Sequence, residues 1–247
     1  LLALVVQLYV ISTDWDTRGR HFHALFLFQL MGINGAFLTG DAFNLFVFFE
    51  VLLIASYGLM IHGAGRDRLR AGVQYIAFNL IASTLFLFAL ATIYSVTGTL
   101  NMADLAVKVA VLPEGDSALI RVAAILLIAV FAIKGALVPL QFWLPGTYAN
   151  APGPVAALFA IMTKVGVYSI IRTHWGIFGV EAGEAGLAAQ AWLLPLALST
   201  SVLGALGALA AHSMSRMVAY LTVSSVGTIL AGVGLFTPET LSATLYY

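Results

Sequence analysis

Continuous apolar runs, each long enough to cross a lipid bilayer, follow one another along nearly the whole chain. Hydrophobic residues make up 61% of the 247 residues and charged residues only 9%, whereas a soluble domain has roughly 45–50% apolar and about 25% charged residues. A helix needs about 17–25 apolar residues to span the hydrocarbon core. The sequence therefore predicts an all-α, polytopic membrane helix bundle. A membrane barrel is not predicted, because its strands would alternate in short segments.

The apolar runs predict seven full spans and a partial span at each end of the chain. We expect residues 1–247 to form a single transmembrane domain that is incomplete at both ends, since the chain starts inside one apolar run and stops as another begins. No basic segment like that of a signal peptide precedes the first run. The full spans are predicted at 22–39, 42–62, 72–96, 119–140, 154–177, 187–211 and 214–236, and the partial ones at 1–11 and 240–247.

The loops between the predicted spans alternate in charge. Arginine-rich loops of membrane proteins lie on the cytoplasmic side, so the basic loops and a connection around residues 141–152 are predicted to share one end of the bundle. The basic loops contain Arg18 and Arg20, then Arg66, Arg68 and Arg70, then His212 and Arg216; the acidic loops contain Asp104, Lys108, Glu114 and Asp116, then Glu181 and Glu184.

The net charge is zero and no basic stripe is present, which argues against a nucleic-acid partner.

Three charged residues, Glu50, Lys134 and Lys164, are predicted to lie near the middle of three different spans. A charge at the bilayer centre costs about 3 kcal/mol or more, so such residues face a protein interior or a wet cavity and mark ion paths. A buried lysine can gain and lose a proton near neutral pH, whereas an arginine stays charged. We therefore predict a proton relay in which Glu50 and Lys134 form a switchable pair.

Each of the three charged residues also has a structural interpretation. Glu50 would then hold a neighbouring helix by one hydrogen bond, and the lysines would be permanently paired. All three would in that case be inert contacts for assembly. Separate measurements of assembly and transport in variants distinguish these interpretations from a relay.

A helix break is predicted just beyond Lys134. Pro139 cannot donate a hydrogen bond to the carbonyl of Gly135, so the helix should kink or end there. The freed carbonyl and the small Gly135 would make room for water. Interrupted helices beside intramembrane charge are a recurrent feature of ion pathways.

Several other polar residues have simpler explanations. Asp41 follows Gly40 between two spans, where a cap of the next helix is expected. Arg172 is expected to extend its side chain to the outer interface. The pairs Gly32 with Gly35 and Gly204 with Gly207 are interpreted as close helix contacts.

No metal or cofactor site is predicted. The chain has no cysteine, which excludes thiolate ligands and disulfides. The histidines lie near predicted span ends, and no two have the spacing of four residues expected of a metal-binding pair on a helix. We expect them to be solvated at the membrane interface. They are His21, His23, His62, His174 and His212.

Four motifs in this order resemble the antiporter-like membrane subunits shared by complex I and the Mrp multisubunit cation/proton antiporters, those of the Mrp type above all. The resemblance covers essentially the whole chain. It implies a parent of about fourteen helices, of which this piece holds roughly the fourth to the tenth. The motifs are Gly40-Asp-Ala-Phe-Asn-Leu-Phe-Val-Phe-Phe-Glu50, Phe131-Ala-Ile-Lys134 running into Phe142-Trp-Leu-Pro145, Ala151-Pro-x-Pro-Val, and Thr163-Lys164-Val-Gly-Val-Tyr168.

The resemblance implies a role for each charged residue. Glu50 and Lys134 match the family's ion pair, and Lys164 matches the lysine that relays protons laterally. Relatives in complex I often carry a histidine in the span at 214–236, where this chain has Ser224-Ser-Val-Gly227, and this favours the Mrp branch. The family's exit-side charged residue would lie beyond this piece.

The implied function is that of a secondary transporter and not of an enzyme: a proton-translocating subunit of a Na⁺ or K⁺/H⁺ antiporter in a bacterial cell membrane. Its implied partners are other membrane subunits, H⁺, Na⁺ or K⁺, and membrane lipid, with no cofactor. The alternative is a proton-pumping, non-redox subunit of a respiratory NADH:quinone oxidoreductase or a membrane-bound hydrogenase.

Overall fold

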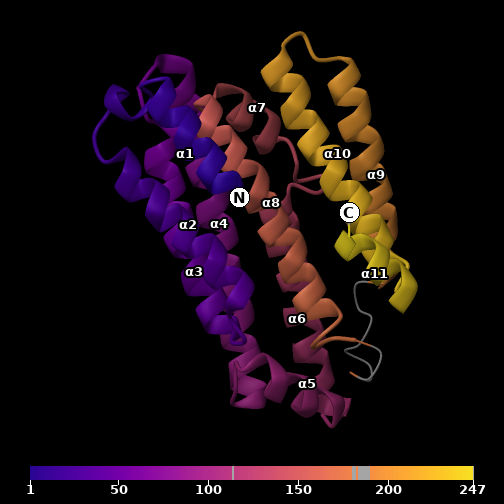
Figure 1. The fold of residues 1–247 in the computed structure, drawn as a ribbon. Helices are drawn as coiled ribbons and strands as arrows, with labels where there is room; N and C mark the ends of the chain where they lie inside the picture. Colours follow the sequence, from indigo (N-terminus) through magenta and orange to yellow (C-terminus); the bar gives the residue numbers. More distant parts are fainter. Residues whose placement is uncertain (113, 180–181, 183–189, 247) are drawn as a thin grey trace.

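A computed structural model describes residues 1–112, 114–179, 182 and 190–246 as a bundle of helices (Figure 1). Over these residues, α3, α4, α6, α8, α9 and α10 are long and apolar enough to cross a membrane. The helices in chain order are α1 Leu2–Ser12, η1 Asp16–Arg18, α2 Phe22–Leu38, α3 Ala42–Met60, α4 Arg66–Thr97, α5 Met102–Ala110, α6 Glu114–Gly135, α7 Trp143–Asn150, α8 Gly153–His174, α9 Gln190–Leu209, α10 Met214–Gly234 and α11 Pro238–Tyr246.

The predicted spans correspond to helices, with three differences. The span predicted at 22–39 is a shorter helix of 17 residues, α2. The span predicted at 119–140 ends at Gly135, so α6 stops five residues early. The short helices α5 and α7 lie in segments that were expected to be loops. The start of the span predicted at 187–211, together with Glu181 and Glu184, lies outside the described residues.

The connections gather at two ends of the bundle as the alternation of charge predicts. Figure 1 shows α7 and the turn between α9 and α10 at one end, and α5 at the other. At the α7 end, Arg68 Nε donates a hydrogen bond to the carbonyl of Asn150 at 3.0 Å. At the α5 end, the amide of Met102 donates to the carbonyl of Gly40 at 2.9 Å. The basic connections thus lie together with residues 141–152.

Glycines allow two pairs of helices to pack closely, as predicted. A Cβ atom on Gly32 of α2 would lie 2.7 Å from the backbone nitrogen of Leu52 in α3. A Cβ atom on Gly204 of α9 would lie 2.5 Å from the backbone nitrogen of Ser224 in α10. Real Cβ atoms need about 3.5 Å from such neighbours. Each helix pair therefore depends on the missing side chain.

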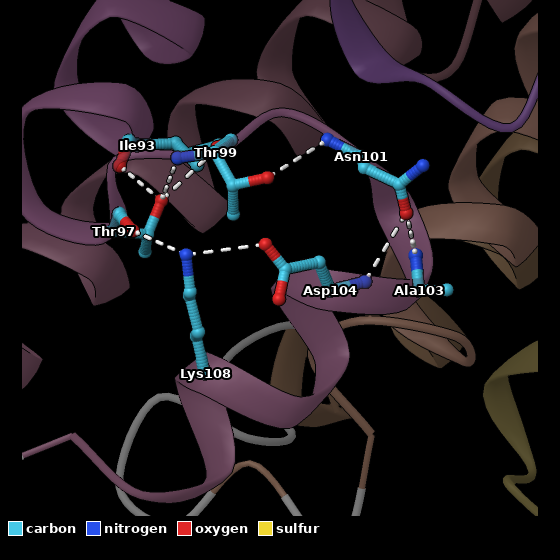
Figure 2. Close-up of polar contacts among 7 residues, drawn as sticks. All are labelled: Ile93, Thr97, Thr99, Asn101, Ala103, Asp104 and Lys108. Atoms are coloured by element: carbon cyan, nitrogen blue, oxygen red, sulfur yellow. Dashed lines mark hydrogen bonds and ion pairs between the residues drawn. The ribbon is translucent and has the colours of Figure 1, made fainter.

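A polar cluster stabilises the α5 end, where α4 ends and α5 begins (Figure 2). The side chain of Asn101 caps α5 by accepting from the amides of Ala103 and Asp104 at 3.1 and 3.2 Å. Lys108 Nζ lies 3.1 Å from Asp104 Oδ2 and donates to the carbonyl of Thr97 at 3.1 Å. Hydrogen bonds from Thr99 and Lys108 hold the pKa of the exposed Asp104 carboxyl below its usual range.

An aromatic cluster marks the place where α3, α4 and α6 meet. The rings of Phe49, Phe86 and Phe131 lie within 5.2–6.1 Å of one another, centroid to centroid, and all three side chains are fully buried. Such edge-to-face and stacked pairs add to the packing energy of the burial itself. This apolar junction adjoins the predicted charged site, since Phe49 is the residue before Glu50.

Candidate functional site

Lys134 lies in the last turn of α6 with its amine directed at one face of α4. Its side chain is buried, with an exposed fraction of 5%. Nζ lies 3.2 Å from Ser83 Oγ, and 3.4 Å from both the carbonyl oxygen and the Oδ1 of Asn79. The centre of the Phe49 ring lies 5.7 Å from the same atom. The three donor hydrogens of an ammonium thus meet three neutral oxygen acceptors, which allows this site to hold the charged amine.

Ser83 links this amine to Glu50. The Ser83 hydroxyl donates a hydrogen bond to Glu50 Oε1 and also contacts Lys134 Nζ. Among the described residues the ion pairs are Asp104 with Lys108 and Asp16 with His23. The structure therefore brings Glu50 and Lys134 together through a hydroxyl group rather than as a direct ion pair. Glu50 is half-buried on the α4 side of α3.

Helix α4 positions both bridging groups. Asn79 and Ser83 are four residues apart and therefore share one face of the helix. Asn79 Nδ2 donates to the carbonyl of Tyr75 at 2.9 Å. This bond sets the orientation of the amide, because the reverse orientation would aim a donor at the lysine ammonium and an acceptor at a carbonyl. Oδ1 consequently faces Lys134.

Asn79 and Ser83 were not predicted from the sequence as members of the site. A signal was available, since two polar residues spaced by four occur in a largely apolar stretch of α4. A polar residue in a transmembrane helix often only bonds its own backbone, as Thr84 does with the carbonyl of Leu80. The approach of Glu50 from α3 and of Lys134 from α6 distinguishes Ser83 from such a case.

The break predicted just beyond Lys134 is present. Helix α6 ends at Gly135, and Ala136 adopts a left-handed conformation with φ of 57°. The amide of Ala136 donates to the carbonyl of Ile133 at 3.2 Å, and the amide of Leu137 donates to that of Ala132 at 2.9 Å. This pattern is a Schellman cap. The cap ends the helix at Gly135, four residues before Pro139.

Neighbouring helices hold the broken segment in place. The amide of Val138 donates to Thr200 Oγ1 of α9 at 2.9 Å, and the indole of Trp143 in α7 donates to the carbonyl of Ile133 at 3.1 Å. A Cβ atom on Gly166 of α8 would lie only 2.8 Å from the amide nitrogen of Gly135. The backbone of α8 therefore packs directly on the end of α6, next to Lys134.

Lys164 is not part of the Lys134 cluster. It precedes Gly166 by two residues, and such positions are rotated by about 200° around a helix. Its side chain therefore starts on the opposite side of α8 from Gly135. Tyr168, one turn farther along the same face, donates to the carbonyl of Phe37 in α2 at 2.8 Å. The half-buried Lys164 makes no hydrogen bond or ion pair within the described part of the chain.

The remaining predictions have mixed outcomes. Asp41 caps α3 as expected, because its Oδ1 accepts from the amide of Asn44 at 2.9 Å. Arg172 is half-buried at the α5 end, where it donates to the carbonyl of Thr39 at 3.4 Å. The expectation of interfacial solvation is wrong for His62 and His174, whose exposed fractions are 5% and 2%.

Backbone carbonyls explain why these two histidines are buried. His62 Nε2 lies 2.9 Å from the carbonyl of Trp15. His174 lies between Thr173 Oγ1, at 2.9 Å, and the carbonyl of Ala124, at 3.3 Å. A buried imidazole needs such partners. Among the described residues no group of three or more side chains could hold a metal ion.

The chain is similar to known membrane proteins over its whole length. Residues 39–247 match a family model whose description reads "NADH:quinone oxidoreductase/Mrp antiporter, TM". The chain is 48% identical over 246 residues to a subunit of a probable K(+)/H(+) antiporter of Rhizobium meliloti, covering 100% of this chain and 46% of that protein. It is 45% identical over 249 residues to a Na(+)/H(+) antiporter subunit of Alkalihalophilus pseudofirmus, covering 100% of this chain and 49% of that protein.

A solved structure shows the same fold. One chain in the structure of the Mrp complex from Dietzia sp. DQ12-45-1b matches with a TM-score of 0.88 and 35% identity, covering 100% of this chain and 45% of that chain. The present chain thus spans about half the length of the relatives that it matches.

Proposed function

Because this chain belongs to the NADH:quinone oxidoreductase/Mrp antiporter transmembrane family, we propose that it is the proton-translocating part of one subunit of a Na⁺ or K⁺/H⁺ antiporter. It is a multi-pass membrane protein, and its proposed location is the bacterial cell membrane. Its proposed partners are the other membrane subunits of such an antiporter, with H⁺ and a monovalent cation as the transported ions.

The observation that carries this proposal is the linked set of Glu50, Ser83 and Lys134. A carboxylate and an amine, both able to take up a proton, lie on separate helices and are joined by one hydroxyl. Keeping charge at this depth is costly, and a bundle held together only by apolar packing has no need for it. The chemistry would be proton transfer alone, with no covalent bond made to a substrate.

Lys164 has a separate place in the proposal. It lies on the far side of α8 from Lys134, at the level where α8 packs on the broken end of α6. A proton leaving Lys134 would need water or a movement of α8 to reach it. We therefore assign to Lys164 the lateral step of the relay.

The pumping-subunit alternative gains no separate support. The relatives described above are antiporter subunits, and both transporters and respiratory pumps would use the same proton chemistry. The proposed protein is accordingly part of a secondary transporter. Redox chemistry would require chains other than this one.

The test is the substitution Glu50→Gln in the full-length subunit within its complex. The amide keeps the shape and can accept from Ser83, but it cannot take up a proton, so we expect cation-driven proton movement to fall at least about tenfold. Inverted membrane vesicles with a fluorescent pH indicator report that movement when Na⁺ or K⁺ is added. Assembly is measured separately by native electrophoresis.

The matched control is Glu239→Gln, the same chemical change at an exposed position in the first turn of α11. This variant should transport at the normal rate. A Glu50→Gln complex that assembles and transports like the wild type would refute the proposal.

A further inference from the structure

The Ser83 hydroxyl lies between two ionisable groups that form no direct ion pair. It contacts Lys134 Nζ at 3.2 Å and donates to Glu50 Oε1. We propose that Ser83 carries protons between Lys134 and Glu50 and is a relay residue of the transport path. The inference rests on the proposed function and adds to Glu50, Lys134 and Lys164 a fourth proton-handling group on a fourth helix, α4.

The direction of each hydrogen bond follows from the chemistry of the groups. A lysine ammonium can only donate, an ionised carboxylate can only accept, and a serine hydroxyl has one hydrogen. The Ser83 hydrogen must therefore point toward Glu50, and a lone pair of the same oxygen must face Lys134. This leaves a continuous donor path from the amine to the carboxylate.

A proton can move along this path with every bond accounted for. One N–H bond of the Lys134 ammonium breaks as an O–H bond forms on Ser83, and the original Ser83 O–H bond breaks as an O–H bond forms on Glu50. The products are a neutral amine, an intact hydroxyl and a carboxylic acid. Ser83 is unchanged apart from the direction of its hydrogen, so the hydroxyl must rotate before a second proton passes the same way.

The surroundings make other routes between the two groups poor. Ser83 is buried, with an exposed fraction of 6%, and the rings of Phe49 and Phe86 cover this region of α3 and α4. Phenylalanine rings cannot pass a proton, whereas a hydroxyl can both accept and donate one in apolar surroundings.

Asn79 acts by positioning the amine. Its carbonyl oxygen and Oδ1 accept two of the three hydrogens of Lys134, which directs the third hydrogen at Ser83. Asn79 itself accepts no proton in the path. Its contribution is to keep the amine at the distance at which Ser83 can receive a proton.

The experiment replaces Ser83 in the full-length subunit within its complex. Ser83→Ala removes the oxygen, and Ser83→Cys fills the same space with a thiol that is a weak donor and acceptor. Both should lower the antiport rate at saturating Na⁺ or K⁺ by at least about tenfold, which is less than the about 10²–10⁴-fold that one proton-transfer group typically contributes. Ser83→Thr keeps the hydroxyl and should restore most of the rate.

Two controls separate a relay from a structural role. Thr84→Ala removes a hydroxyl from the next residue of α4, which is exposed and bonds its own helix, and it should transport normally. Replacing H₂O by D₂O should slow Ser83→Ala more than the wild type, because proton transfer then limits its rate. A defect of packing alone would not increase the isotope effect.

The outcomes test the relay role of Ser83 and the proposed function separately. Normal transport by Ser83→Ala or by Ser83→Cys, or equal loss in Ser83→Ala and Ser83→Thr with no larger isotope effect, overturns the relay role of Ser83. If Glu50→Gln is inactive in the same vesicles while Ser83→Ala is normal, the relay role alone fails. Normal transport by Glu50→Gln refutes the proposed function itself.

Discussion

The contact between α8 and the end of α6 leads to a prediction for Gly166→Ala. A Cβ atom at Gly166 would lie 2.8 Å from Gly135 N, 3.1 Å from Gly135 Cα and 3.1 Å from the carbonyl carbon of Lys134. All three neighbours are backbone atoms, so no side-chain rotation can relieve the clash. The atoms need about 3.5 Å, so the two segments must separate by about 0.7 Å.

That separation is large compared with the slack in the charged site. Lys134 Nζ lies 3.2 Å from Ser83 Oγ, close to the upper limit of about 3.5 Å for a hydrogen bond, so a displacement of about 0.7 Å at the end of α6 disturbs this contact. Overpacking of this kind costs about 1–3 kcal/mol of stability. We expect the melting temperature of the purified complex to fall and antiport to fall at least about tenfold, which corresponds to about 1.4 kcal/mol in the barrier.

The control is Gly146→Ala in α7, where an added Cβ atom would have no neighbour within 4 Å. The same chemical change should leave both stability and transport unchanged. Thermal unfolding of the purified complex and antiport in inverted vesicles are the two measurements. If Gly166→Ala keeps more than half of the wild-type transport rate, the argument that this contact positions Lys134 is wrong.

Three further substitutions test the two lysines and the helix break. Lys134→Ala should abolish antiport. Lys164→Arg should reduce the antiport rate less but measurably, because arginine keeps the charge but does not release its proton. Normal transport by Lys164→Arg over a range of pH would show that Lys164 is only a counter-charge. Pro139→Ala should leave the break intact, because the left-handed Ala136 already ends the helix. Slower hydrogen exchange over residues 134–140 together with reduced transport would instead show that Pro139 maintains the break.

Local features of the helices that carry the charged site could be predicted because they depend on neighbouring residues in the chain. Asp41 caps α3 through an amide only three residues away, and a cap depends on little else. The break after Lys134 was also predictable, although its cause was assigned to Pro139. The Schellman cap places Ala136 in a conformation that usually favours glycine, so residue preferences alone did not indicate where α6 ends.

The fold class, the approximate positions of the spans and the charged residues within them follow from the linear pattern of residues alone. A bilayer requires long apolar helices and makes buried charge costly, so both can be recognised from a linear pattern. The family relationship agrees with this pattern, since the matched region covers residues 39–247.

Tertiary structure alone decided how those charges are connected. Ser83 bridges Glu50 and Lys134 because α3, α4 and α6 meet at one aromatic junction. Lys164 is directed away from that bridge because Gly166, two residues later, faces Gly135. Contacts between helices depend on the rotation and depth of each helix within the bundle. These quantities follow from side-chain packing over the whole molecule, and no local run of residues specifies them.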